Sequence, residues 1–187
     1  KNIFLREDKQ GINLPENIKR AIEAVPEKKN IGQTPLDNFL NSFLGSYDEI
    51  NGGFSGMPKF PITLPLLHLL ERKQHLEKVF HTLKKMGNGG IYDHLGGGFC
   101  RYSVDVHWEI PHFEKMLYDN ALLLQAYAKA YALSKDLLFK EKADGIFTYV
   151  KNVLYSGKGF FSSQDADSEG GEGKYYVFTQ DEIQKII

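Results

Sequence analysis

Asn51-Gly52-Gly53-Phe54-Ser55-Gly56 is the first of three similar segments in which glycine precedes phenylalanine in a turn. The other two are Gly96-Gly97-Gly98-Phe99-Cys100 and Gly157-Lys158-Gly159-Phe160-Phe161-Ser162. Recurrence at intervals of several tens of residues is typical of repeat folds, in which each unit buries its apolar face on a neighbour. Glycines also end helices in many proteins, which is the alternative explanation. That alternative does not account for the shared phenylalanine.

Helical periodicity fills the sequence around these turns. Apolar residues at helical spacing predict a first helix over residues 34–47, with Thr34 as its N-cap, which ends before Asn51-Gly52-Gly53. A second helix is expected from Thr63, as N-cap, to Leu70, and a third over residues 76–86. Residues 15–25 form a weaker helical candidate within a polar N-terminal stretch.

Two further helices differ from each other in pattern. Residues 114–133 are apolar almost all round, which indicates a helix surrounded by other helices. Residues 137–154 have one apolar face, made of Phe139, Ala143, Ile146, Phe147, Val150 and Leu154. A buried helix followed by a one-faced helix suggests an inner and an outer layer. A strand is expected over residues 174–178, and a capping box at Thr179 and Glu182 predicts that a last helix begins there.

Composition places the chain among ordinary globular domains. It has 187 residues, is 42% hydrophobic and 25% charged, and carries a formal net charge of −1. Its Lys and Arg residues form no basic stripe, so we expect no nucleic-acid partner. No apolar run approaches the roughly 20 residues that a membrane span needs, so we expect no membrane partner. The single cysteine, Cys100, excludes an internal disulfide framework and favours a reducing compartment, and we expect a cytoplasmic protein.

Long motifs give the chain a family resemblance between about Thr34 and Ile187. It resembles the YyaL and spermatogenesis-associated family, and the residues that carry the likeness are Gly52-Gly53-Phe54, Pro58-Lys59-Phe60-Pro61, Gly89 to Phe99, Arg101-Tyr102-Ser103-Val104-Asp105, Pro111 to Asn120, and Gln164 to Gly170. Proteins of this family combine an N-terminal thioredoxin-like domain with a six-hairpin helical toroid. The toroid is similar to those of N-acylglucosamine 2-epimerases and six-hairpin glycosidases, whose active sites lie in the funnel lined by the inner helices.

The resemblance implies an all-α fold with minor β structure in loops, a partial (α/α)6 toroid of helical hairpins. At 187 residues, about half of the ring is expected. Residues 1–32 are interpreted as a connector from a thioredoxin-like domain, and residues 33–187 as a partial toroid domain truncated at its C-terminus, inside the helix that Thr179 begins. The remaining hairpins are expected partners. Because inner-helix surface would then be exposed, we expect self-association.

The strongest chemical cluster runs from Asp93 to Glu114. Histidine titrates near neutrality and suits proton transfer, and a carboxylate beside it fixes its tautomer. His112 is therefore predicted to act as a base with Glu114 as its partner, and Asp93 as a third catalytic group. Both His112 and Glu114 are expected just before or at the start of an inner helix, whose dipole favours a carboxylate. The alternative is a polar network that pins a long loop.

Aromatic side chains flank the same acids, as in many small-molecule pockets. Sugars present one apolar face and a rim of hydroxyls, so aromatic and polar residues together favour a sugar ligand. Arg101 either clamps an anionic group or pairs with Asp105. The predicted substrate-binding residues are Phe54, Lys59, Tyr92, His94, Arg101, Tyr102, Trp108, Tyr118, Asp119, Asp167 and Glu169.

A second acidic cluster occupies residues 164–170. Asp165 is predicted to be catalytic, and Asp165 or Asp167 could pair with Glu114 across the funnel, as two carboxylates do in glycosidases. A calcium loop is a competing interpretation, but Tyr176 stands where an EF-hand needs its bidentate acid. A solvated turn braced by its own side chains is the third. We expect no resident metal or cofactor.

Two functions remain open on the sequence. The first is a carbohydrate-active protein that uses His/carboxylate acid–base chemistry in a toroid funnel, as an epimerase, an isomerase or a glycoside hydrolase does. The second is a non-catalytic scaffold or partner-binding module for a thioredoxin-like domain. The first requires that the Asp93–Glu114 stretch and the Asp165–Glu169 turn meet at one open end of the helical ring.

Overall fold

The computed structural model describes residues 33–54 and 56–187, with side chains from Pro35 onward. The chain divides into two compact units, residues 1–38 and 39–187, and the core described below lies in the second. The expected connector, residues 1–32, and the helical candidate at 15–25 lie outside the described residues.

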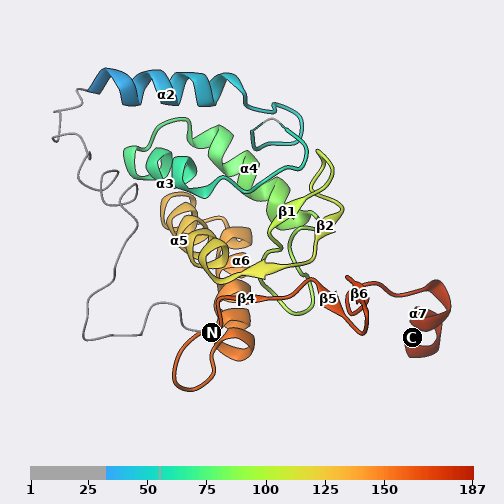
Figure 1. Ribbon diagram of the computed structural model, residues 1–187. Coiled ribbons are helices and arrows are strands. Elements are labelled where there is room, and N and C mark those ends of the chain that lie inside the picture. The colour runs from blue at the N-terminus through green and yellow to red at the C-terminus, as the bar shows by residue number, and fades with distance from the viewer. Residues whose placement is uncertain (1–32, 55) are drawn as a thin grey trace, which may run out of the picture. The chain divides into compact units, whose positions relative to one another are not determined.

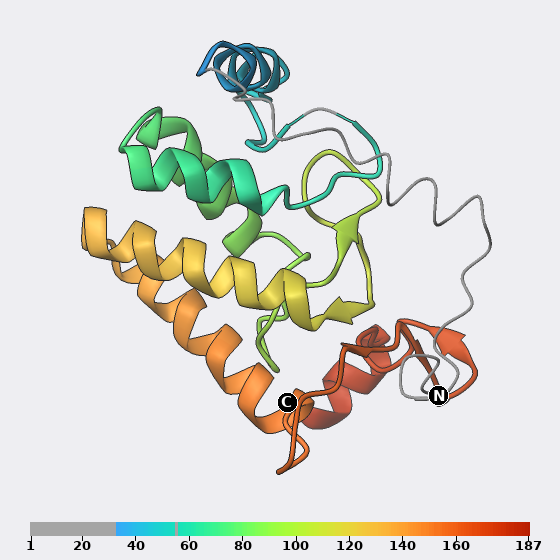
Figure 2. The same cartoon turned by 60° about the vertical axis from the view of Figure 1, so that its left-hand side comes forward.

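Two helical hairpins form the body of the second unit. The first joins α3 (Thr63–Arg72) to α4 (Leu76–Asn88), and the second joins α5 (Leu117–Ser134) to α6 (Leu137–Tyr149). The first helices of the hairpins, α3 and α5, contact each other, and so do the second helices, α4 and α6 (Figures 1 and 2). The helices therefore form two layers, each of which takes one helix from each hairpin; which layer is the inner one stays a prediction.

Apolar residues at helical spacing make the core between these layers. On α4 the buried apolar residues are Val79, Leu83 and Met86, three and four positions apart, which places them on one helical face. α3 adds Leu66, Leu69 and Leu70, and α5 and α6 add Leu123, Ala126, Tyr127, Ala130, Phe139 and Ile146. At about 25 cal/mol per Å² of apolar surface, this burial is the main force that holds the hairpins together.

Three further helical segments complete the described helices. They are α2 (Gln33–Gly45), the π-helical segment η1 (Val150–Leu154), which continues α6 directly, and α7 (Gln180–Ile186). The predicted capping box of α7 is confirmed: Thr179 Oγ1 accepts from the Glu182 N–H, and the Glu182 carboxylate accepts from the Thr179 N–H. Among the described helices, none is long and apolar enough to cross a membrane.

Short antiparallel strand pairs form in the loops, and one of them, β3–β4, joins segments that are far apart in the sequence. β1 pairs with β2, β3 with β4, and β5 with β6. Their bounds are β1 Tyr102–Ser103, β2 Pro111–His112, β3 Lys115–Met116, β4 Ser163–Gln164, β5 Asp167–Ser168 and β6 Gly171–Glu172. The β3–β4 pair joins Lys115 to Gln164, and so brings the start of α5 beside the segment that follows η1.

The three glycine–phenylalanine turns share one local structure, as their sequences predict. In each turn a tyrosine forms an isolated antiparallel bridge with the phenylalanine, and the pairs are Tyr47–Phe54, Tyr92–Phe99 and Tyr155–Phe160. The first turn packs against α4 and the second turn against α6, in each case the second helix of the hairpin that follows the turn. A Cβ at Gly52 would lie 2.8 Å from the backbone of Thr82 on α4, and one at Gly97 would lie 2.4 Å from the carbonyl of Gly145 on α6.

Several expected helix boundaries are wrong. α2 begins at Gln33, so Thr34 lies inside it, and it ends at Gly45, because Tyr47 takes part in the bridge to Phe54. The N-cap of α3 is Ile62, while Thr63 is the first helical residue and donates its hydroxyl to Pro61 O. α5 begins at Leu117 and not at 114, because residues 115–116 pair with β4.

Three other expectations also fail. Residues 174–176 form a turn closed by the bond from Tyr176 N to Gly173 O, and the structure has no strand over 174–178. α5 is buried on one face only within the described residues, and Ala121, Gln125 and Ala128 are exposed. Phe147 does not belong to the buried face of α6, and it is 56% exposed.

Candidate functional site

The β1–β2 ribbon positions His112. Its register places Tyr102 opposite His112, and the two rings stack with centroids 4.8 Å apart and 14° between their planes. The loop between the strands is held by Asp105, whose carboxylate accepts from the backbone N–H groups of His107 and Ile110. Burial acts to raise the pKa of Asp105, but these N–H donors together hold it below its ordinary value.

Two carboxylates flank the His112 imidazole. Nδ1 lies 2.5 Å from Glu172 Oε1, and Nε2 lies 3.9 Å from Glu114 Oε2. An ionised carboxylate only accepts hydrogen bonds, so the neutral ring must carry its proton on Nδ1 to bond Glu172. The lone pair of Nε2 then points toward the side of Glu114, at a distance beyond a hydrogen bond.

Arg101 holds Glu114 on the other side. Its Nη1 donates to Glu114 Oε2 at 2.9 Å, and the backbone N–H of Arg101 donates to Glu114 O at 2.8 Å. The bond to Glu114 raises the pKa of the guanidinium above its usual value. Arg101 Nε is buried and meets no hydrogen-bond acceptor among the described residues. The expected alternative partner of Arg101, Asp105, instead bonds its own loop.

Asp119 lies beside this pair, in the first turn of α5. Burial raises the pKa of Asp119 to about 6; the guanidinium of Arg101 opposes this rise, and the negative charge of Glu114 adds to it. A carboxyl with that pKa exchanges protons close to neutral pH, which is the property that general acids and bases need.

Asp93 makes contacts of a different kind. Its Oδ1 accepts from the N–H groups of Leu95 and Gly96, and its Oδ2 accepts from Lys115 Nζ at 2.7 Å. Lys115 is only 1% exposed and also donates to Gly97 O. Burial acts to raise the pKa of Asp93, but the bond from Lys115 and those N–H groups hold it below its usual value. These bonds brace the turn.

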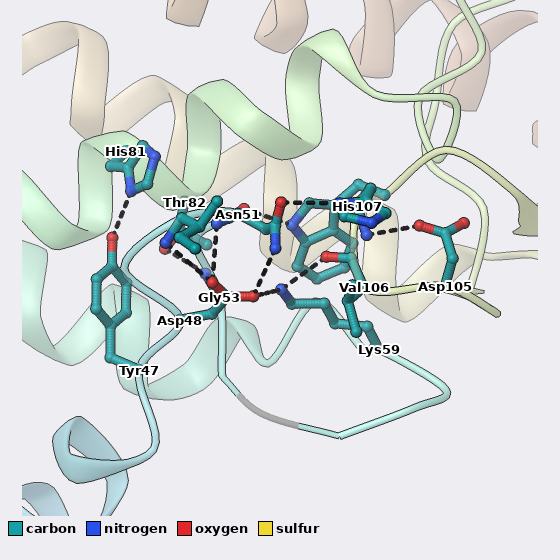
Figure 3. A network of polar contacts seen from close by, with 12 residues as sticks. Tyr47, Asp48, Asn51, Gly53, Lys59, His81, Thr82, Asp105, Val106 and His107 are labelled. Carbon is teal, nitrogen blue, oxygen red and sulfur yellow. Dashed lines mark hydrogen bonds and ion pairs between the residues drawn. The ribbon is translucent and has the colours of Figure 1, made fainter.

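The first turn repeats this arrangement with Asp48 and Lys59 (Figure 3). Asp48 accepts from two N–H groups of its own turn, those of Ile50 and Asn51, and from Lys59 Nζ at 2.8 Å. Lys59 is also 1% exposed, and its Nζ lies 5.0 Å from the centroid of the Trp108 ring. The sequences of both turns read Tyr-Asp-x-x-x-Gly-Gly-Phe, at residues 47–54 and 92–99.

The segment after β4 lies against the residues that precede α5. Phe113 stacks on Tyr176, with ring centroids 5.1 Å apart. Gly173 has φ +70°, and a Cβ there would lie 2.4 Å from the Phe113 ring, so the close approach requires glycine. The residues that follow the Asp165–Glu169 turn therefore meet the end of the Asp93–Glu114 stretch. That the two segments share one open end of a helical ring stays a prediction.

The acid from this region that reaches His112 is Glu172, and not Asp165 or Asp167. Asp165 Oδ1 accepts from the Asp167 N–H within the turn, and both residues are exposed. Glu169 pairs with Lys174, with 3.4 Å between Oε2 and Nζ. No group of three or more His, Cys, Asp or Glu residues is arranged to hold a metal ion within residues 33–54 and 56–187.

A cavity of about 390 Å³ lies between the second turn and the end of the chain. One side is formed by Asp93, Leu95 and Gly96, and the other by Glu169, Lys174 to Phe178 and Glu182. His112 and Glu114 do not line it. The structure thus has two separate polar regions, the His112 cluster (Arg101, His112, Glu114, Asp119 and Glu172) and this cavity.

The other predicted substrate-binding residues take several positions. Phe54, Tyr92 and Trp108 are buried in the core, and Trp108 Nε1 donates to Asn51 O. His94 is exposed, with Nε2 3.0 Å from Gly89 O. Tyr118 is exposed at the start of α5, next to Asp119. Cys100 is buried, and burial raises the pKa of its thiol to about 12, which excludes a thiolate near neutrality.

Sequence reasoning missed Glu172, Lys115 and Asp48. Asp48 could have been found by extending the turn comparison back to the Tyr-Asp pair. Asn120 was also missed: its side chain accepts from Phe99 N and donates to Phe99 O, which ties the second turn to α5. Glu172 has no such signal, because it is exposed and its partner lies 60 residues away.

Some known proteins are similar to this chain in sequence, and others are similar to it in fold. Spermatogenesis-associated protein 20 of Homo sapiens is 44% identical over 158 residues, which are 75% of this chain and 20% of that protein. The chain is a homologue of spermatogenesis-associated protein 20. The Mus musculus protein gives the same identity, and an uncharacterized protein of Caenorhabditis elegans is 35% identical over 161 residues. No family model matches the chain.

The chain spans about a fifth of the length of these relatives. Among solved structures, cellobiose 2-epimerase from Spirochaeta thermophila superposes with a TM-score of 0.58 at 19% identity, over 81% of this chain and 42% of that chain. A sugar epimerase from a ruminal bacterium gives 0.59 at 20%, over 74% and 42%. At these identities the likeness shows the fold alone: the hairpins are part of a helical toroid like that of sugar epimerases, as the resemblance implied.

Proposed function

We propose that the His112 cluster transfers protons at a carbon atom of a sugar, in an epimerase-like reaction. One observation carries the proposal: His112 is held between two carboxylates and bonds Glu172 through Nδ1. A neutral ring that donates from Nδ1 has an unprotonated Nε2, which can act as a base. The toroid fold supports the substrate class, because the structures that share it are those of sugar epimerases. A fold hosts many functions, so the experiment below tests the His112 cluster itself.

The proposed step starts from the open-chain form of an aldose. His112 Nε2 removes the proton from the carbon next to the carbonyl, and the electron pair of the broken C–H bond moves onto the carbonyl oxygen. Arg101, whose side chain is 40% exposed, stabilises the resulting enolate by its positive charge. Asp119, with a pKa of about 6, returns a proton to the opposite face of the same carbon and inverts it.

Glu172 has a positioning role in this scheme. Its carboxylate keeps the proton of neutral His112 on Nδ1 and stabilises the imidazolium that forms after proton removal. Glu114 does not bond Nε2 in this structure, and its bond to Arg101 fixes the guanidinium beside the ring. Asp93 and Asp165 take no part in the proposed step. Asp93 bonds Lys115 and two N–H groups of its own turn, and Asp165 bonds the Asp167 N–H.

Deuterium exchange tests the proposal. The chain is incubated with cellobiose in D₂O, and NMR follows loss of the C2 proton of the reducing glucose. General base catalysis contributes about 10²- to 10⁴-fold, so His112→Ala should lower the exchange rate at least about 100-fold, and Glu172→Gln should lower it less. His68→Ala, on α3, controls for loss of a histidine. Exchange that is equal in wild type and His112→Ala would refute the proposal.

A non-catalytic scaffold is the second candidate. The observation that favours it is the Asp–Lys pair that both turns contain, Asp48 with Lys59 and Asp93 with Lys115. These pairs hold the turns against the hairpins, and that structural role requires no ligand. On this alternative, His112→Ala and Glu114→Gln lower the melting temperature and the chain exchanges no C2 proton. A thioredoxin-like domain, as the family resemblance implies, would be the partner that such a scaffold positions.

A further inference from the structure

The cavity beside the second turn is not part of the proton-transfer scheme. We propose that it is a separate binding site for an uncharged saccharide, which extends the proposed function by placing a sugar in a region outside the His112 cluster. Its volume, about 390 Å³, falls within the range of about 300–1,000 Å³ found for small-molecule sites. The proposal rests on the carbohydrate class proposed above.

Two tyrosines make an aromatic corner in this cavity. The rings of Tyr175 and Tyr176 have centroids 5.1 Å apart and stand at 88° to each other. Tyr176 is fixed, because it stacks on Phe113 and lies 5.0 Å from Lys115 Nζ. Tyr175 is 66% exposed, so one ring is held rigid and the other offers an open face. A sugar ring, whose C–H face is apolar, packs on such a surface.

The charged groups of the cavity already have partners. Asp93 is paired with buried Lys115, and Glu169 with Lys174. Glu182 accepts from both the N–H and the hydroxyl of Thr179. A charged ligand would have to compete with these contacts. An uncharged ligand with several hydroxyl groups would not, because a carboxylate can accept about four hydrogen bonds and the hydroxyls would add to those already made.

The cavity and the His112 cluster share one short segment. Glu172 reaches His112, and four residues later Tyr176 lines the cavity, while Gly173 between them contacts the Phe113 ring. Phe113 and Tyr176 stack between the two regions. Since the two sites have different side chains, their occupancy can be measured separately.

Residue-resolved NMR tests the proposal. Cellobiose is titrated into the ¹⁵N-labelled chain, and shifts are expected at the amides of Gly96, Lys174 and Tyr176. Removing one aromatic face costs roughly three- to tenfold in affinity, so Tyr175→Ala should weaken binding by about that factor. Tyr155→Ala is the matched control, because Tyr155 is an exposed tyrosine that does not line this cavity. It should leave the affinity unchanged.

Each result distinguishes this proposal from the proposed function. Cavity shifts that persist in His112→Ala and weaken in Tyr175→Ala support a separate saccharide site. Shifts confined to Arg101, His112 and Glu114 would overturn the cavity site and leave proton transfer supported. Cavity shifts that Tyr175→Ala does not weaken, or no shifts in this region, would also overturn it. The deuterium-exchange assay then decides the proposed function independently.

Discussion

Lys115→Met tests the buried ion pair that braces the second turn. The substitution keeps the length of the apolar stem but removes the charge that faces Asp93. Lys115 is 1% exposed and Asp93 is 14% exposed, so the remaining carboxylate would be largely cut off from water. Breaking a buried pair by removing one partner costs about 3–5 kcal/mol. Asp93 keeps its bonds from Leu95 and Gly96, so we expect the lower end, about 3 kcal/mol.

Urea unfolding measures this loss, and a second variant tests its cause. Asp93→Asn combined with Lys115→Met leaves no unpaired charge, so the double variant should be more stable than Lys115→Met alone. Lys140→Met serves as the control, since Lys140 and Asp144 form an exposed pair on α6 whose loss should be hard to detect. If Lys115→Met costs no more stability than Lys140→Met, or if the double variant recovers none of the loss, the buried pair does not brace the second turn.

Three further predictions concern pH, backbone and surface. The pKa of Asp119 in the folded chain, about 6, lies above its usual value, so ionisation of Asp119 lowers the stability as the pH rises between about 4 and 6. Asp119→Asn removes this loss. The variant should therefore melt at a higher temperature than the wild type at pH 7.5, and the difference should disappear below about pH 4. Gly97→Ala should lower the melting temperature more than Gly157→Ala: both glycines have positive φ, but a Cβ meets Gly145 O only at Gly97. The chain should self-associate in light scattering and Phe160→Asp should reduce its average mass, since Phe160 is 55% exposed beside an apolar depression; a monodisperse wild-type monomer would contradict this.

The sequence predicted the helices and the repeated turns because both depend on local patterns. Apolar stripes at helical spacing define α3, α4 and α6, and the glycine–phenylalanine segments define the bridges at Phe54 and Phe99. Helix starts were less predictable, since the start of α5 is set by pairing with β4, some fifty residues later. The helix propensity of residues 115–116 contains no information about a strand that pairs with them from elsewhere in the chain.

The candidate site was predicted in part. His112, Glu114 and Arg101 were identified from the density of ionisable groups around them, and the structure brings these three together. The contact of His112 with Glu172 depends on how the last loop folds back, which no local pattern specifies. The same density of ionisable groups predicts Asp93 as a catalytic residue, and the structure shows its carboxylate bonded to buried Lys115. An acid in a glycine-rich turn has the same sequence whether it binds a ligand or a buried lysine.

Both proposed sites depend on the segment after β4 lying against the residues before α5. If it does, Glu172 reaches His112 and the cavity has its aromatic wall. Nuclear Overhauser effects between the Gly173 α-protons and the Phe113 ring measure this contact directly. We predict strong cross-peaks, because a Cβ at Gly173 would lie 2.4 Å from that ring. Their absence, in a folded chain whose Tyr102–His112 cross-peaks are present, would show that the segment after β4 does not pack there and would contradict both proposed sites.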